Sequence, residues 1–115
     1  MTPGTLTVPF YRGARYAHRL TLTNTSDGSP LDLTGLGPFV FTVKNARNGI
    51  VIANATVASD YDATGVIDVE ILAAVTDRFP LGEDSVTVGM RDNDNNPYIQ
   101  STVDVLPFTP EPRAL

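Results

Sequence analysis

The side chains that could carry chemistry are few, and their spacing matches no known reaction centre. The sequence holds one histidine, His18, and no cysteine. A catalytic histidine needs a nucleophile and an orienting acid beside it, and the common metal sites that use two or three histidines are excluded by count. The sequence also lacks the G-x-S-x-G elbow and the glycine-rich phosphate loops. We therefore expect no enzyme activity, no cofactor and no metal site.

One acidic loop has the spacing of a calcium site at its start. The run Asp92-Asn93-Asp94-Asn95-Asn96-Pro97 resembles the first half of a calcium-binding loop. Such a loop needs glycine where Pro97 stands and a bidentate glutamate where Val103 stands. The sequence therefore predicts a plain hairpin turn at this place.

The basic side chains are distributed unevenly along an acidic chain. The sequence has 8 basic and 13 acidic residues, a net charge of −5, and Arg12, Arg15 and Arg19 precede the first acid, Asp27. This asymmetry could steer the N-terminal region onto an acidic partner, including a second copy of the chain, and assembly would then weaken with salt. The alternative is a set of solvated arginines. The acidic balance argues against nucleic-acid binding.

Aromatic side chains offer a second set of candidate contacts. Tyrosine favours interfaces because it has an apolar body and a polar tip, although the same residues can pack at the rim of an ordinary domain. We expect partial exposure of the following aromatics: Tyr11, Tyr16, Tyr61, Tyr98 and Phe108. His18 alternates with Tyr16, Leu20 and Leu22, which places it on a half-buried strand face.

The elements that position these residues are predicted to be β-strands. Apolar and polar residues alternate in short runs between turn clusters, which is typical of half-buried strands. The predicted strands are 6–10, 16–23, 39–47, 50–57, 65–71, 86–90 and 97–106, and 31–35 is predicted as a short extended piece that ends in a glycine turn. Asn48-Gly49 predicts a type I′ hairpin between two of them, and residues 72–79 could hold one helical turn before Pro80 and Gly82.

These strands predict a single immunoglobulin-like antiparallel β-sandwich with extended termini. Seven or eight short strands at a spacing of about ten residues are typical of that class, although the Cys–Trp–Cys set of antibody domains is missing. We expect an N-terminal arm or edge strand over 1–10, the sandwich over 11–106 and a proline-rich tail over 107–115. Leu31 and Leu33 are predicted to close one end of the core.

The N-terminal residues and the hydropathy predict where the chain resides. Met1 to Leu6 lack a charged region followed by an apolar run, so no signal peptide is expected. Apolar stretches fall far short of the roughly 20 residues that a membrane helix needs. We expect a protein that stays in the cytosol or leaves it by lysis, with no membrane partner.

Four segments resemble small structural proteins of tailed phages. They are Phe10-Tyr11-Arg12-Gly13, Leu20-Thr21-Leu22-Thr23-Asn24, Asp27 to Gly35 and Phe39 to Lys44, and the most specific is Pro30-Leu31-Asp32-Leu33-Thr34-Gly35. The pattern is similar to the immunoglobulin-like N-terminal domains of upper baseplate and tail-fibre-linked proteins. Arg15 departs from it, standing near where such proteins often carry an acid, and many relatives continue into a fibre or stalk.

The resemblance implies a virion structural protein assembled in the host cytoplasm, which binds other virion proteins and copies of itself. A tail or baseplate adaptor is favoured, in a ring of three, six or twelve copies by family analogy; a capsid decoration or head-completion protein is the alternative. A carbohydrate-binding or adhesin module is a third hypothesis, with Tyr98 beside the 92–96 loop as its contact. The predicted protein-interaction residues are Tyr11, Arg12, Arg15, Arg19, Pro107, Phe108 and Pro110.

Overall fold

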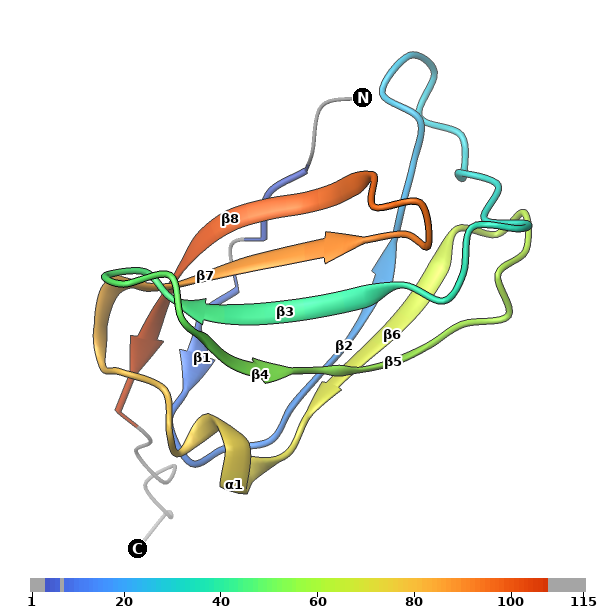
Figure 1. Ribbon diagram of the computed structural model, residues 1–115. Helices are drawn as coiled ribbons and strands as arrows, with labels where there is room; N and C mark the ends of the chain where they lie inside the picture. Colours follow the sequence, from blue (N-terminus) through green and yellow to red (C-terminus); the bar gives the residue numbers. More distant parts are fainter. Residues whose placement is uncertain (1–3, 7, 108–115) are drawn as a thin grey trace, which may run out of the picture.

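The computed structural model describes residues 4–6 and 8–107, which form two β-sheets and one short helix (Figure 1). The eight strands of this part are β1 (Phe10–Tyr11), β2 (Tyr16–Thr21), β3 (Val40–Asn45), β4 (Val51–Asn54), β5 (Thr56–Ala58), β6 (Val66–Ile71), β7 (Gly82–Arg91) and β8 (Pro97–Leu106). Helix α1 (Ala73–Thr76) is the helical turn predicted within 72–79. It is the one helix of the described part, so no helix there is long and apolar enough to cross a membrane.

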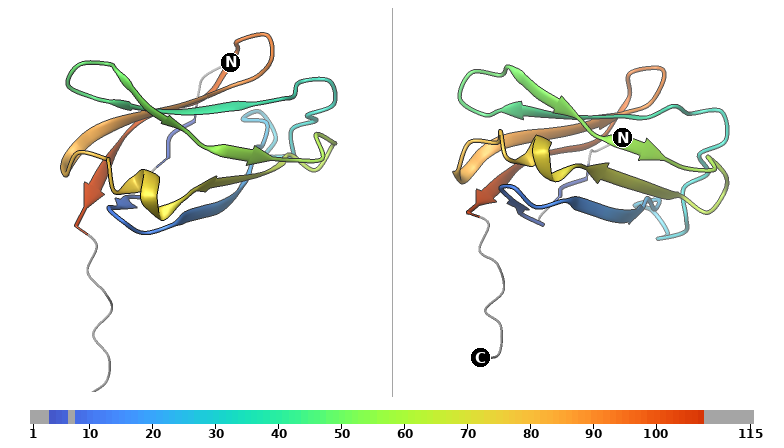
Figure 2. Two further views of the ribbon diagram at one scale, coloured as in Figure 1. Left: turned by 60° about the horizontal axis from the view of Figure 1, so that its bottom comes forward. Right: turned by 90° about the horizontal axis from the view of Figure 1, so that it is seen from below.

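The strands divide between two sheets that lie face to face as two layers (Figure 2). One sheet has the order β1-β8-β7-β3-β4, and the other has the order β2-β6-β5. Neighbouring strands are antiparallel except β1, which runs parallel to β8. The all-β prediction is therefore confirmed.

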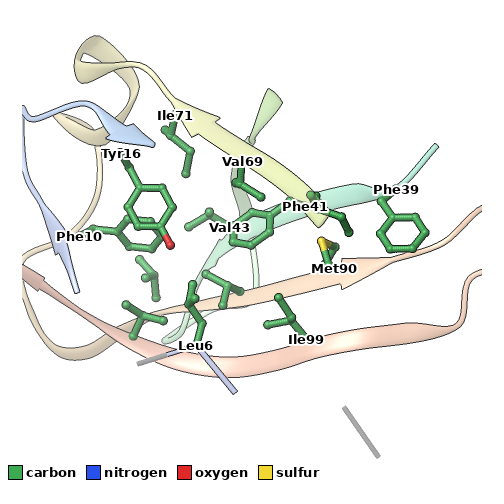
Figure 3. Packing of buried hydrophobic residues seen from close by; sticks show 14 of the residues in the cluster. Leu6, Phe10, Tyr16, Phe39, Phe41, Val43, Val69, Ile71, Met90 and Ile99 are labelled. Carbon is green, nitrogen blue, oxygen red and sulfur yellow. The ribbon is translucent and has the colours of Figure 1, made fainter. Parts of the chain in front are cut away.

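The core lies between the two sheets, and the predicted alternation supplies most of it (Figure 3). Within the predicted strands 39–47, 65–71 and 86–90, apolar residues spaced two apart are buried on one face: Phe39, Phe41 and Val43; Ile67, Val69 and Ile71; Val86, Val88 and Met90. Leu33 is fully buried, as predicted, and Leu31 packs against the cluster with partial exposure. Burial of these side chains is the main favourable contribution to folding.

The hairpin predicted at Asn48-Gly49 is present, but its turn type is different. Gly49 has a φ of 72°, whereas Asn48 is outside the positive-φ region that a type I′ turn requires at both positions. The loop is instead closed by the Gly49 N–H, which donates to the Asn45 carbonyl at 2.8 Å. The Asn48 side chain accepts a hydrogen bond from the Ile50 N–H at 2.9 Å.

The single strand predicted over 50–57 is wrong, because the chain changes sheets within it. β4 pairs with β3 in the five-stranded sheet, and β5 pairs with β6 in the three-stranded sheet. Ala55, between β4 and β5, donates its N–H to the Phe41 carbonyl at 2.8 Å. This bond holds the chain at the crossing point.

The described part of segment 1–10 is an edge of the five-stranded sheet. Gly4 donates its N–H to the Tyr98 carbonyl at 2.8 Å, and its carbonyl accepts from the Gln100 N–H at 3.0 Å. Leu6 and Phe10 are buried in the core. β1 comprises Phe10 and Tyr11, of which only Phe10 lies within the predicted strand 6–10.

Candidate interaction surface

Three of the predicted interaction residues come together where β1 and β8 end. Tyr11 pairs with Leu106 in the parallel ladder, and the Arg12 N–H donates to the Leu106 carbonyl at 2.9 Å. Pro107 follows directly and is exposed. The Tyr11 side chain is 48% exposed. We call Tyr11, Arg12 and Pro107 the exit surface; Phe108 and Pro110 lie outside the described residues.

Helix α1 fixes the turn that carries Arg12. The Arg12 Nε donates to the Asp77 carbonyl at 2.9 Å. Thr76 is fully buried. Its hydroxyl accepts a hydrogen bond from the Gly13 N–H at 3.1 Å and donates one to the Ala14 carbonyl at 2.8 Å. The buried Thr76 hydroxyl therefore has its hydrogen-bond partners within the turn, as buried polar groups generally do. These bonds fix the backbone of the turn that carries Arg12.

The other two predicted arginines lie elsewhere, on the outer face of the three-stranded sheet. Arg19 donates to both carboxylate oxygens of Asp68, at 2.8 and 3.1 Å, and Arg15 donates to Glu70 at 2.5 Å. The hydrogen bond from Arg19 lowers the pKa of Asp68 and raises that of Arg19. These exposed pairs contribute little stability, but they place a carboxylate beside each cation. Arg12, Arg15 and Arg19 therefore do not form one free basic patch.

The 92–96 loop is a hairpin turn, as predicted, and its buried carboxylate is occupied by protein donors. Asp92 is 5% exposed and accepts from the N–H groups of Asp94 and Asn96, each at 2.9 Å, and from the Tyr98 hydroxyl at 2.8 Å. Burial raises the pKa of Asp92, but the hydrogen bonds outweigh it and hold the pKa below its ordinary value. The carboxylate stabilises the turn.

Two tyrosines and the histidine have the opposite exposure from the prediction. Tyr98 is 7% exposed, with its hydroxyl on Asp92, so the contact proposed for sugars is buried. Tyr16 is 5% exposed, and its ring lies 4.6 Å from that of Phe10; burial raises its pKa to about 12. His18, expected to be half-buried, is exposed, and its ring lies tilted against that of Tyr16 with 4.4 Å between ring centroids.

An apolar groove that the sequence did not predict lies beside β2. It runs between β2 and the segment 4–6 that borders β8, and its apolar lining is Leu6, Leu20, Leu22, Leu31 and Ile99. Alternation correctly put Leu20 and Leu22 on one face, with Leu22 directly after the end of β2. Alternation could not show that β2 lies at the edge of its sheet, because that depends on the order of the strands.

Within residues 4–6 and 8–107, no three His, Asp or Glu side chains gather as metal donors. No protein-family model matches the sequence, and a comparison with curated proteins found no match.

Proposed function

We propose that this chain is a non-enzymatic structural subunit of a tailed-phage particle, best placed as a tail or baseplate adaptor that assembles through protein–protein contacts. The segment with the most specific resemblance, 30–35, supports this proposal by its geometry. Asp32 accepts from the N–H and the hydroxyl of Thr34 at 3.0 and 2.7 Å, and Leu33 beside it is fully buried. The motif is therefore a structural corner of the domain.

The proposed fold within the all-β class is the immunoglobulin-like sandwich, and strand connectivity supports it. Immunoglobulin-type domains place strands B, E and D in one sheet and C, F and G in the other. With β2 as strand B, the order β2-β6-β5 corresponds to B-E-D. The order β8-β7-β3-β4 then corresponds to G-F-C with an added strand beside C, and β1 borders G.

The observation that carries the functional proposal is the hydrogen-bonded turn beside the exit surface. Tyr11, Arg12 and Pro107 share one end of the domain, where Thr76 and Asp77 hold the turn that carries Arg12. Pro107, at this end, is the first residue of the proline-rich sequence 107–115. Proline-rich segments lose less conformational entropy when they dock than flexible ones do. A preformed surface next to such a segment suits an assembly subunit.

Native mass spectrometry of the purified chain tests this proposal by counting copies. An adaptor of the proposed kind forms a closed ring, for which family analogy gives three, six or twelve copies. A chain that stays monomeric at millimolar concentration would contradict self-assembly.

The neighbouring genes test the location in the particle. Tape-measure and fibre genes beside this one support the tail, whereas portal and major capsid genes support a head-completion or decoration role and overturn the adaptor.

A further inference from the structure

Strand β2 has an open edge in the described part of the chain. It pairs with β6 on one side and with no described strand on the other. The Leu22 N–H donates to the Gly65 carbonyl at 2.8 Å, and because backbone groups alternate in an antiparallel ladder, the even-numbered residues of β2 bond to β6. The N–H and C=O groups of Ala17, Arg19 and Thr21 therefore point away from the sheet. Such an edge is a template for another strand.

The inner face of β2 is also incompletely covered. On its neighbour β6, Ile67 and Val69 are at most 1% exposed. On β2, Leu20 is only partly buried and His18 is exposed, although both side chains share the inward-facing parity of buried Tyr16. The apolar groove beside β2 lies next to these residues. An open backbone edge and an apolar groove at the same place are the two requirements for strand addition.

We propose that this edge binds the C-terminal segment 108–114 of a second copy of the chain as an added antiparallel strand. The segment reads Phe-Thr-Pro-Glu-Pro-Arg-Ala, in which even positions are apolar or proline and odd positions are Thr109, Glu111 and Arg113. The alternation matches a strand with an apolar inner face and a polar outer face.

The prolines select the antiparallel direction. In an antiparallel pair, residues opposite Ala17, Arg19 and Thr21 bond to them and share their outward side-chain face. These are the odd residues of the segment, which all have an N–H. Pro110 and Pro112 then lack an N–H only on the solvent side, where an edge strand tolerates proline. In a parallel pair the inward-facing prolines would have to donate, which they cannot.

The direction also requires that the segment come from another copy. An antiparallel strand on β2 puts Phe108 beside Leu22, at the far end of β2. In the same chain, however, Phe108 follows Pro107, which adjoins Arg12 at the near end. β2 has six residues, so the two places are separated by roughly 20 Å at 3.3 Å per residue. One peptide unit cannot span that distance.

The register that places Glu111 opposite Arg19 gives the added strand polar contacts on its outer face and apolar contacts on its inner face. The carboxylate of Glu111 then joins the outer-face charges around Arg19 and Asp68. On the inner face, Phe108 enters the groove beside Leu22, and Pro112 covers His18. The inference rests on the self-assembly proposed above and identifies the contact that makes it. Donation from each copy to the next is a head-to-tail contact, which generates rings when the rotation closes.

A pair of proline substitutions in the full chain tests the hydrogen-bond parity. Thr109→Pro removes an N–H that the ladder uses, and we expect it to shift the assembly to monomers in light scattering after size exclusion. Ala114→Pro removes an N–H that faces solvent, and we expect it to leave the mass unchanged. Both positions lie outside the core described above. If the unsubstituted chain assembles and the two variants have equal masses, the strand addition is overturned and the proposed self-assembly stands. If the unsubstituted chain is a monomer, both proposals are overturned.

Disulfide trapping tests the partner, and the lack of native cysteine makes the result unambiguous. Arg19 and Glu111 form a hydrogen-bonded pair in the proposed register, and such opposed residues have Cα atoms about 5.5 Å apart, which suits a disulfide. We mix chains carrying only Arg19→Cys with chains carrying only Glu111→Cys and oxidise them. The expected result is a covalent heterodimer on a non-reducing gel, with none when Glu83→Cys replaces Arg19→Cys. Absence of the heterodimer, or an internal disulfide in the double variant without dimers, overturns binding of a second copy.

Discussion

Three aspartates use the same local device to hold the loops of the domain. Asp27, Asp32 and Asp62 each accept from both the N–H and the hydroxyl of the Ser or Thr two residues later. These hydrogen bonds lower the pKa of each carboxylate from its ordinary value of 3.8. Asp92 is held in a similar way by Asp94 and Asn96, with the addition of Tyr98.

Stability should therefore fall in acid. A carboxylate whose pKa is lowered by folding stabilises the native state fully above its unfolded pKa and loses that contribution as pH falls through the folded pKa. For these four aspartates the loss begins near the ordinary value of 3.8 and continues below it. Thermal unfolding measured from neutral pH to about pH 3 should show a declining midpoint below about pH 4. A midpoint that stays constant would contradict the assigned hydrogen bonds.

The core role of Leu33 predicts a large truncation effect. Its side chain is fully buried, so Leu33→Ala should lower the free energy of unfolding by about 2–4 kcal/mol. Urea denaturation measures the change. Leu81→Ala is the matched control, because Leu81 is 47% exposed and should cost much less. A loss well under 1 kcal/mol for Leu33→Ala would show that this corner is not part of the core.

At the scale of elements, alternation identified the strands and their inner faces but could not identify the sheet edges. Ile67 and Val69 are buried as predicted because β6 has a strand on each side. His18 has the same alternation, yet it is exposed on the edge strand β2, whereas Tyr16 on that strand is buried against Phe10. Alternation also could not predict that 50–57 divides between two sheets as β4 and β5. The alternation continues through the whole segment, as it would in a single strand. The candidate groove was missed for the same reason.

Gly65 joins three segments at the start of β6, and its substitution should be costly. It has a φ of 70°, and an added Cβ would lie 2.4 Å from the Leu22 carbonyl oxygen and 3.2 Å from the backbone of Leu31. Gly65→Ala should therefore cost both the left-handed backbone strain, about 1–2 kcal/mol, and the movement of these segments.

Gly28→Ala is the control for the backbone strain alone. Gly28 has a φ of 75° and nothing within 4 Å of an added Cβ. Urea denaturation of the two variants should give a clearly larger loss for Gly65→Ala. Equal losses would show that the contact with Leu22 and Leu31 is not tight.

At the scale of the whole molecule, the charge asymmetry of the sequence does not become a charge asymmetry of the surface. Arg15 and Arg19 lie beside Glu70 and Asp68, which come from β6 and were distant in sequence. The sequence could predict the all-β class and most of the strands. The proposed contact surface depends instead on which edge strand has an apolar groove beside it, and in the described part of the chain β2 is such an edge.

The proposed assembly joins copies of the chain through their C-terminal segments. Its most direct test compares the native mass of the full chain with that of a chain ending at Pro107. Removal of 108–115 takes away the proposed added strand and none of the described core. The account predicts multimers for the full chain and monomers for the shortened chain, with the same far-ultraviolet circular dichroism and unfolding midpoint in dilute solution. Equal masses for the two chains would contradict it.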